Sequence, residues 1–196
     1  MDRFDARTAL VVVDLQNDFA EPAGSLAVDG GEAVIAIVNA AIREARESGA
    51  LVVATQDWHP ESTPHFARDG GVWPIHCVGG TWGAELHPSL ELPLDTPRVR
   101  KGVNGEDGYS GFTMRDPLSG EEIPTELEEL LRHGQIQGVV VCGLATDYCV
   151  KATALDAVRL GFAVELLPGA VAAVDLEPGD GERAMTEMAD AGVRIG

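Results

Sequence analysis

A cysteine in the second half of the sequence occupies a position that favours nucleophilic chemistry. Cys149 follows a β-branched run over residues 138–142 and a short turn, and it falls in the first turn of a helix predicted over residues 147–160, with Thr146 as N-cap. The free N–H groups and the dipole at a helix N-terminus favour a thiolate. The alternative is a small buried side chain without chemistry, which is the commoner state of a lone cysteine and which suits Cys142 within the strand-like run.

An aspartate and a lysine could supply what a cysteine nucleophile needs. Asp14 directly follows the apolar run 8–13, and Lys101 follows the short strand-like run 98–100. Taken singly, each fits an ordinary polar residue at the end of a strand. Taken with Cys149, they offer a base for the thiol proton and a cation that stabilises both that base and developing negative charge. Only as a set do these residues indicate nucleophilic catalysis.

A second group of residues has the chemistry of a metal site. Asp57 and His59 are two positions apart, so their side chains share one face of an extended segment. His65 and His76 follow in the same long loop. Three imidazoles and one carboxylate suit zinc, iron, manganese or another first-row divalent ion, and leave room for water or substrate. Solvent exposure is the alternative for any single loop histidine, but a cluster of ligand types favours one divalent metal ion.

Alternating strands and helices must position these residues. The predicted strands cover residues 8–13, 51–55, 98–100, 138–142, 162–167 and 193–195, and the predicted helices cover residues 32–47, 125–134, 147–160 and 182–191. Two long loops interrupt the pattern, and they span residues 56–97 and 102–120. Because the first of them is longer than ordinary connections and contains the histidine cluster, it is a candidate functional insert.

This order of elements predicts an α/β fold built on a doubly wound, mostly parallel sheet with helices on both faces. In such sheets, functional residues gather at the carboxyl ends of the strands. Asp14, Asp57, Lys101 and the turn 143–149 all fall at those ends. The length and the continuous pattern favour a single domain over residues 1–196.

Composition narrows the classes of partner. The formal net charge of -18 should repel polyanions, so we expect no binding to nucleic acid or to anionic membranes. The apolar runs are far shorter than a membrane span, and the acidic start differs from a secretory signal, which favours a cytoplasmic protein. Three cysteines cannot all pair with one another, so at least one thiol is free for chemistry.

The motifs together resemble the nicotinamidase/pyrazinamidase family of isochorismatase-like cysteine hydrolases. Each motif is weak alone, whereas their ordered combination from the first strand to the helix after Cys149 is specific. The matching segments are residues 13–19 (VDLQNDF), 57–60 (DWHP) with His65, 73–77 (WPIHC), 101–102 (KG), 109–112 (YSGF) and 143–150 (GLATDYCV).

The resemblance implies a role for each of these candidates. Asp14 would be the base, Lys101 its electrostatic partner and Cys149 the nucleophile. The implied metal ligands are Asp57, His59, His65 and His76, and the aromatic residues implied to line the substrate ring are Phe19, Trp73 and Tyr109. The resemblance also implies a cis peptide bond between Leu144 and Ala145, and an oxyanion hole formed by the backbone N–H groups of Ala145 and Cys149.

The expected activity is hydrolysis of nicotinamide to nicotinate and ammonia through a thioester, with pyrazinamide as a further substrate. A related hydrolase acting on another small amide is the first alternative. A metal-binding or nucleotide-binding α/β protein without hydrolase activity is the second. Against nucleotide binding, the first strand leads into residues 14–17 (DLQN) with no glycine-rich phosphate loop. The expected partner is a small amide, and a homo-oligomer is left open.

Overall fold

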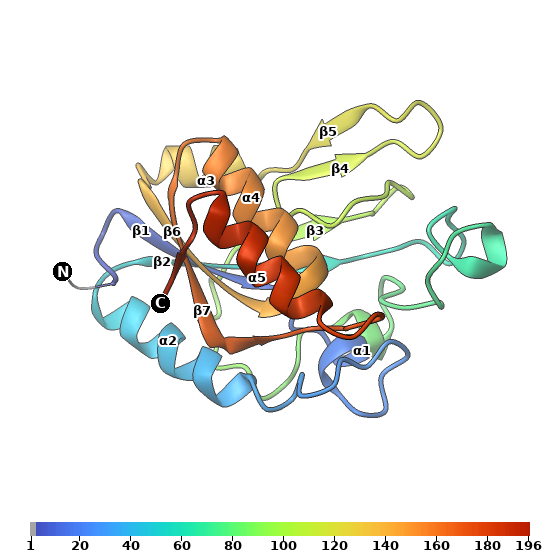
Figure 1. Cartoon of the computed structure of the whole chain (residues 1–196), viewed down its shortest axis with the longest axis horizontal. Coiled ribbons are helices and arrows are strands. Elements are labelled where there is room, and N and C mark those ends of the chain that lie inside the picture. Colours follow the sequence, from blue (N-terminus) through green and yellow to red (C-terminus); the bar gives the residue numbers. More distant parts are fainter. Residues whose placement is uncertain (1–2) are drawn as a thin grey trace.

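One parallel sheet organises residues 3–196, the range that the computed structural model describes (Figure 1). Within this range six strands lie in the order β3-β2-β1-β6-β7-β8, and each neighbouring pair is parallel. The strands are β1 (Thr8–Val13), β2 (Leu51–Asp57), β3 (Arg98–Lys101), β6 (Gly138–Leu144), β7 (Ala163–Ala172) and β8 (Arg194–Ile195). The arrangement confirms the α/β sheet predicted from the alternating pattern.

Helices cover both faces of the sheet (Figure 1). On β1, Leu10 and Val12 belong to one apolar cluster with α2 (Ile35–Glu47), whereas Val11 and Val13 belong to the opposite cluster. The helices of that opposite cluster are α3 (Leu127–His133), α4 (Lys151–Arg159) and α5 (Asp180–Asp190). Because successive side chains of a strand point to opposite faces, a run of buried valines serves both layers.

The strand order reverses between β1 and β6. The chain proceeds outward from β1 through β2 to β3, then returns to place β6 on the other side of β1 and continues outward to β8. This is the topological switch point, where open α/β sheets form a crevice at the carboxyl ends of the strands. Asp14 follows β1 there, and the segment that carries Cys149 follows β6.

Some local structure differs from the sequence prediction. Cys149 lies in a π-helical turn, Thr146–Val150, which leads into α4, and Ala145 rather than Thr146 precedes that turn as its cap residue. Strand β7 runs five residues beyond its predicted end at residue 167. In residues 102–124, β4 (Thr113–Arg115) and β5 (Glu122–Pro124) form an antiparallel hairpin that projects from the sheet (Figure 1). Strands of three residues are too short to show a clear alternation in sequence.

The long insert, residues 56–97, is held by short elements. Turns of 3₁₀ helix lie at Ala67–Asp69 and Trp82–Ala84, and the short helix α1 (Asn17–Ala20) packs near the second of them. The Gln16 side chain donates to the backbone oxygens of Asp57 and Ala84, at 2.7 and 2.9 Å. These bonds join the end of β1 to the insert. Among residues 3–196, no helix is long and apolar enough to cross a membrane.

Candidate active site

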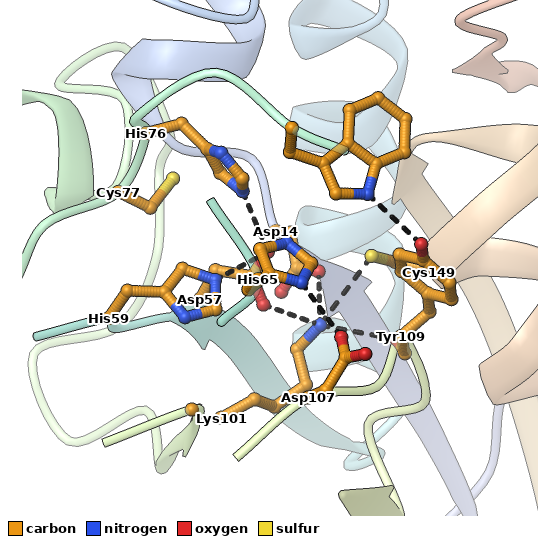
Figure 2. A network of polar contacts seen from close by, with 12 residues as sticks. Asp14, Asp57, His59, His65, His76, Cys77, Lys101, Asp107, Tyr109 and Cys149 are labelled. Carbon is orange, nitrogen blue, oxygen red and sulfur yellow. Dashed lines mark hydrogen bonds and ion pairs between the residues drawn. The ribbon is translucent and has the colours of Figure 1, made fainter. Parts of the chain in front are cut away.

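A buried lysine lies at the centre of the site (Figure 2). Lys101, the last residue of β3, places its Nζ atom 2.7 Å from Asp14 Oδ2 and 2.9 Å from Asp57 Oδ1. The same ammonium donates to the backbone oxygen of Tyr109 at 3.1 Å and lies 3.5 Å from Cys149 Sγ. Groups from four segments therefore lie around one ammonium group. Asp14, Lys101 and Cys149, which were expected to form the catalytic set, lie together.

Asp14 is held in an unusual backbone conformation directly after β1. Its φ of 45° lies in the left-handed region, which a residue other than glycine adopts at a cost. The Thr55 hydroxyl donates to Asp14 Oδ1 at 2.6 Å and accepts from the Asp14 N–H at 3.2 Å. Burial raises the pKa of the Asp14 carboxyl group, although Lys101 and Thr55 oppose the rise. A carboxylate with a raised pKa is a stronger base than an ordinary aspartate.

Cys149 differs from the expectation that its helical position favours a thiolate. Its side chain is buried, and burial raises the pKa of the thiol well above its ordinary value, although the charge of Lys101 lowers it. The neighbouring carboxylates, Asp14 and Asp57, raise the thiol pKa further. The resting residue is therefore a neutral thiol, and it needs a base at the moment of attack. Asp14 is placed for that task, since its carboxylate and Cys149 Sγ lie within 4.8 Å.

Lys101 stays charged in spite of its burial. Burial alone lowers the pKa of an ammonium group, but the carboxylates of Asp14 and Asp57 raise that of Lys101 well above its ordinary value. For Asp57, burial raises the pKa, yet the charge of the Lys101 ammonium beside it holds it well below its usual range. Asp57 is therefore ionised and forms an ion pair with Lys101.

The three predicted histidine ligands meet beside Asp57 (Figure 2). One ring nitrogen from each of His59, His65 and His76 lies within 4.8 Å of the others, and all three side chains are buried. Asp57 Oδ2 lies 3.9 Å from His59 Nε2 and 4.0 Å from His76 Nε2. The three predicted histidines therefore form one close group, and the predicted carboxylate lies beside two of them.

The state of these side chains fits a divalent metal ion. Burial lowers the pKa of His59 to about 4 and also lowers that of His76, so both rings are neutral and keep a lone pair for a metal. Both ring nitrogens of His59 are buried and have no hydrogen-bond partner within residues 3–196, which is costly unless a ligand is present. Three imidazoles and a carboxylate are a donor set that first-row divalent ions accept.

Two of the histidines have their other ring nitrogen fixed by a hydrogen bond. His76 Nδ1 lies 2.7 Å from the backbone oxygen of Pro74, and His65 Nδ1 lies 2.7 Å from Asp107 Oδ1. Each contact occupies Nδ1 and leaves the Nε2 atom of its ring available as a ligand. Asp107 and Thr55 are functional candidates that the sequence prediction did not include.

The other two histidines lie outside the cluster, as the sequence prediction has them. His87 is buried, with Nε2 at 2.8 Å from Glu21 Oε1 and Nδ1 accepting from the Ser89 N–H at 3.2 Å. Both of its ring nitrogens are therefore occupied by hydrogen bonds. His133 is the last residue of α3 and is exposed.

Aromatic side chains line a cavity between the cysteine and the histidines. Phe19, Trp73 and Tyr109, all expected from the sequence, are joined there by Tyr148, which the prediction did not include. The Trp73 Nε1 atom donates to the Tyr109 hydroxyl at 3.0 Å, and the Tyr148 ring packs edge-on against both. The remaining lining residues are Leu26, Val28, Asp57, His65, His76, Ala145, Cys149 and Val174.

The segment between β6 and the π-helical turn has the backbone form that the resemblance implied. The peptide bond between Leu144 and Ala145 is cis. Ala145 and Cys149 both line the aromatic cavity. Their role as an oxyanion hole stays a prediction.

Comparisons with known proteins agree with this geometry. The Isochorismatase domain family matches residues 8–196. The Nicotinamidase/pyrazinamidase of Mycobacterium tuberculosis is 40% identical, over 95% of this chain and 97% of that protein. A crystal structure of the pyrazinamidase of Pyrococcus horikoshii in complex with zinc is 44% identical with a TM-score of 0.86, covering 97% of this chain and 98% of that one. PnC1 from L. infantum in complex with nicotinate is 40% identical with a TM-score of 0.88, covering 98% and 93%.

Proposed function

Because the chain belongs to the isochorismatase family, we propose that it is a nicotinamidase, which hydrolyses nicotinamide to nicotinate and ammonia. One observation carries the proposal: a buried cysteine with a carboxylate and a lysine opens into the same aromatic cavity as two members of the group of three histidines. The aspartate, lysine and cysteine are common to the family in general. The added histidine group suits a substrate that has a polar atom besides its amide, such as a ring nitrogen. Pyrazinamide, which has the same shape and a ring nitrogen at the equivalent position, should also be hydrolysed.

In the acylation step, the sulfur of Cys149 attacks the carboxamide carbon. Asp14 takes the thiol proton as the carbon–sulfur bond forms, because the resting thiol is neutral and the Asp14 carboxylate is within reach. The proton then passes from Asp14 to the nitrogen of the amide, the carbon–nitrogen bond breaks, and ammonia leaves. The product of this step is a thioester on Cys149. Lys101 stays charged throughout and stabilises Asp14 when the carboxylate is ionised.

In the deacylation step, a water molecule replaces ammonia. Asp14, ionised again, takes a proton from the water as its oxygen attacks the thioester carbon. The carbon–sulfur bond breaks and the proton on Asp14 returns to the sulfur of Cys149. Nicotinic acid is released and ionises to nicotinate in solution, where ammonia takes up the proton. One carboxylate therefore serves as base and acid in both halves of the reaction, and no proton is gained or lost by the site.

Two further groups assist the reacting carbon. The backbone N–H groups of Ala145 and Cys149 stabilise the oxygen that becomes negative in each tetrahedral intermediate. Phe19, Trp73 and Tyr109 hold the ring, which turns a bimolecular encounter into an oriented reaction. A divalent ion bound by Asp57, His59, His65 and His76 would supply a Lewis-acidic partner for the ring nitrogen. Zinc, iron and manganese all suit this donor set.

The wider setting follows from the same proposal. The substrate is a small neutral amide, so the acidic surface of the chain does not hinder its approach. Cys77, Cys142 and Cys149 are free thiols, which suits the reducing cytoplasm as the place of the reaction.

The decisive experiment is an assay of purified protein with nicotinamide, in which ammonia and nicotinate are both measured. The wild type should form the two products in equal amounts. Cys149→Ala should abolish turnover while the circular dichroism spectrum and the metal content stay unchanged, because it removes the sulfur and little packing. Substantial activity in this variant would overturn the thioester route. A panel of other small amides distinguishes a nicotinamidase from a relative with another substrate, since the latter would release ammonia faster from a different amide.

A further inference from the structure

The segment between Lys101 and Tyr109 packs against the metal site as well as the catalytic lysine. Gly102 has a φ of 76°, and a Cβ atom there would lie 2.6 Å from His59 Nδ1, so the backbone passes directly beside that ring. The Thr63 hydroxyl donates to the backbone oxygen of Gly105 at 3.2 Å. This segment therefore forms one wall of the histidine group.

One side chain of the segment contacts a ligand directly. Asp107 Oδ1 lies 2.7 Å from His65 Nδ1 and also accepts from the Gly108 N–H at 2.8 Å (Figure 2). The other carboxylate oxygen pairs with Arg115 Nη2 at 3.3 Å. The His65 side chain is 5% exposed and that of Asp107 is 30% exposed, so the contact lies at the boundary between the site and solvent.

The backbone holds Asp107 in place from the opposite side. The Asp107 N–H donates to the Arg115 oxygen at 2.8 Å, and the Arg115 N–H donates to the Asp107 oxygen at 2.6 Å. Arg115 belongs to β4, which pairs with β5 in the projecting hairpin. The hairpin thus holds the backbone of Asp107 by two hydrogen bonds and its carboxylate by one ion pair. A carboxylate held in this way can keep the imidazole ring of His65 in one orientation.

The three histidines differ in what orients them. The Nδ1 atom of His76 is held by a backbone oxygen, which no side-chain substitution removes. Neither ring nitrogen of His59 has a hydrogen-bond partner within the described range. Among the three, His65 is the ring whose orientation depends on another side chain.

We propose that Asp107 is a positioning residue for the metal site, which holds the Nδ1–H of His65 so that its Nε2 atom faces the ion. The inference rests on the proposed function, because it assumes that the histidine group binds a metal. A carboxylate that accepts from a ligating imidazole fixes the tautomer and the ring orientation, and it increases the basicity of the ligating nitrogen. Loss of such a partner typically weakens metal binding about 10–100-fold.

The test compares zinc dissociation constants, measured by chelator competition at fixed pH, for the wild type and two variants. Asp107→Ala should bind zinc about 10–100-fold more weakly. Asp107→Asn keeps the shape of the side chain and a carbonyl oxygen that can accept from the Nδ1–H of His65, so its loss of zinc affinity should be smaller. This variant also keeps the test valid if Asp107→Ala does not fold. Glu106→Gln is the matched control, because the neighbouring carboxylate bonds to Asn104 rather than to a histidine, and its zinc affinity should equal that of the wild type.

A second readout separates positioning from general loosening of the segment. The visible spectrum of the cobalt-substituted protein should change in Asp107→Ala and stay the same in Glu106→Gln, because the absorption depends on the ligand geometry. Zinc affinity and cobalt spectrum equal to the wild type in Asp107→Ala would overturn the inference. A weaker affinity with an unchanged cobalt spectrum and a matching loss of stability in the metal-free protein would also overturn it, since the role would be structural.

The outcome is separable from the proposed function. If the wild type binds zinc but does not hydrolyse nicotinamide, the proposed activity fails while the affinity series still decides the role of Asp107. If the wild type hydrolyses nicotinamide and Asp107→Ala binds zinc normally, the role of Asp107 fails alone. If the wild type binds no divalent metal, the metal site and the role of Asp107 are both overturned.

Discussion

Replacing Lys101 with methionine removes the positive charge that two buried carboxylates share. The Nζ atom lies 2.7 Å from Asp14 Oδ2 and 2.9 Å from Asp57 Oδ1, and the three side chains are between 0% and 7% exposed. Methionine keeps an unbranched, flexible side chain, so the change in packing is small. The substitution therefore leaves two carboxylates close together in a space closed to water.

The expected loss of stability is large at alkaline pH and smaller in acid. Removing one partner of a buried ion pair costs about 3–5 kcal/mol, and we expect that decrease in the free energy of unfolding at pH 8. Without the cation, the pKa of each carboxyl group in the folded variant rises above its value in the unfolded chain. Between those two pKa values the folded state binds more protons than the unfolded state, so stability falls as pH rises through that window. At pH 5 a carboxyl group can take a proton, and the loss should shrink.

Urea unfolding at pH 5 and pH 8 measures this loss, with the metal removed by a chelator so that bound ion adds no stability. The chain has two lysines, and the second provides the matched control. Lys151 pairs with Glu187 at 3.0 Å on the surface, with side chains 30% and 56% exposed, so Lys151→Met should cost less than about 1 kcal/mol. A loss below about 1 kcal/mol in Lys101→Met at pH 8, or an equal loss at both pH values, would refute the reasoning.

Three further predictions concern the thiol, the metal and the ring. The rate of Cys149 alkylation by iodoacetamide, followed by peptide mass spectrometry, should still be rising at pH 9, because burial raises the thiol pKa; a plateau below pH 8 would contradict this. Elemental analysis should find about one divalent transition metal per chain, lost in His59→Ala but kept in His87→Ala, whose ring nitrogens are both occupied by hydrogen bonds. Benzamide lacks the ring nitrogen, so with saturating metal its kcat/KM should be about 10–100-fold lower than that of nicotinamide, and equal rates would exclude the metal as the ring anchor.

The sheet could be predicted from sequence because its strands are unambiguous. The β-branched runs that begin at Thr8 and Gly138 are buried on both faces, and such runs are typical of parallel central strands. The hairpin of β4 and β5 was missed because its strands are short and half exposed, so no face carries an apolar pattern. The π-helical turn around Cys149 was predicted as an ordinary helix start, because the extra residue in its turn has no signature in a single sequence.

The residues of the site also fall into those that the sequence could indicate and those that it could not. Candidates such as Asp14 and His59 could be identified because their residue types and places at strand ends already indicate chemistry. Thr55 and Asp107 act through hydrogen bonds to residues 41 and 42 positions away, and nothing local distinguishes them from other polar residues. The protonation state of Cys149 was also out of reach, because the helix terminus favours a thiolate while burial between carboxylates opposes it. Only the packed structure decides between those effects.

Asp14 and Asp57 contact the same ammonium, yet their surroundings give them different roles. Both are buried, and burial raises the pKa of each. Asp57 pairs with the Lys101 ammonium, which keeps its carboxylate ionised, and it lies beside His59 and His76; an ionised carboxylate is what a metal ligand requires. For Asp14, burial and the neighbouring charge of Asp57 keep the pKa raised although Lys101 and Thr55 oppose the rise, so it can accept and return a proton. When their surroundings separate the pKa values of two carboxyl groups in this way, the group with the higher pKa can act as the base and the group with the lower pKa stays charged. Lys101 makes both possible, because a single cation offsets the repulsion between the proton carrier and the metal ligand.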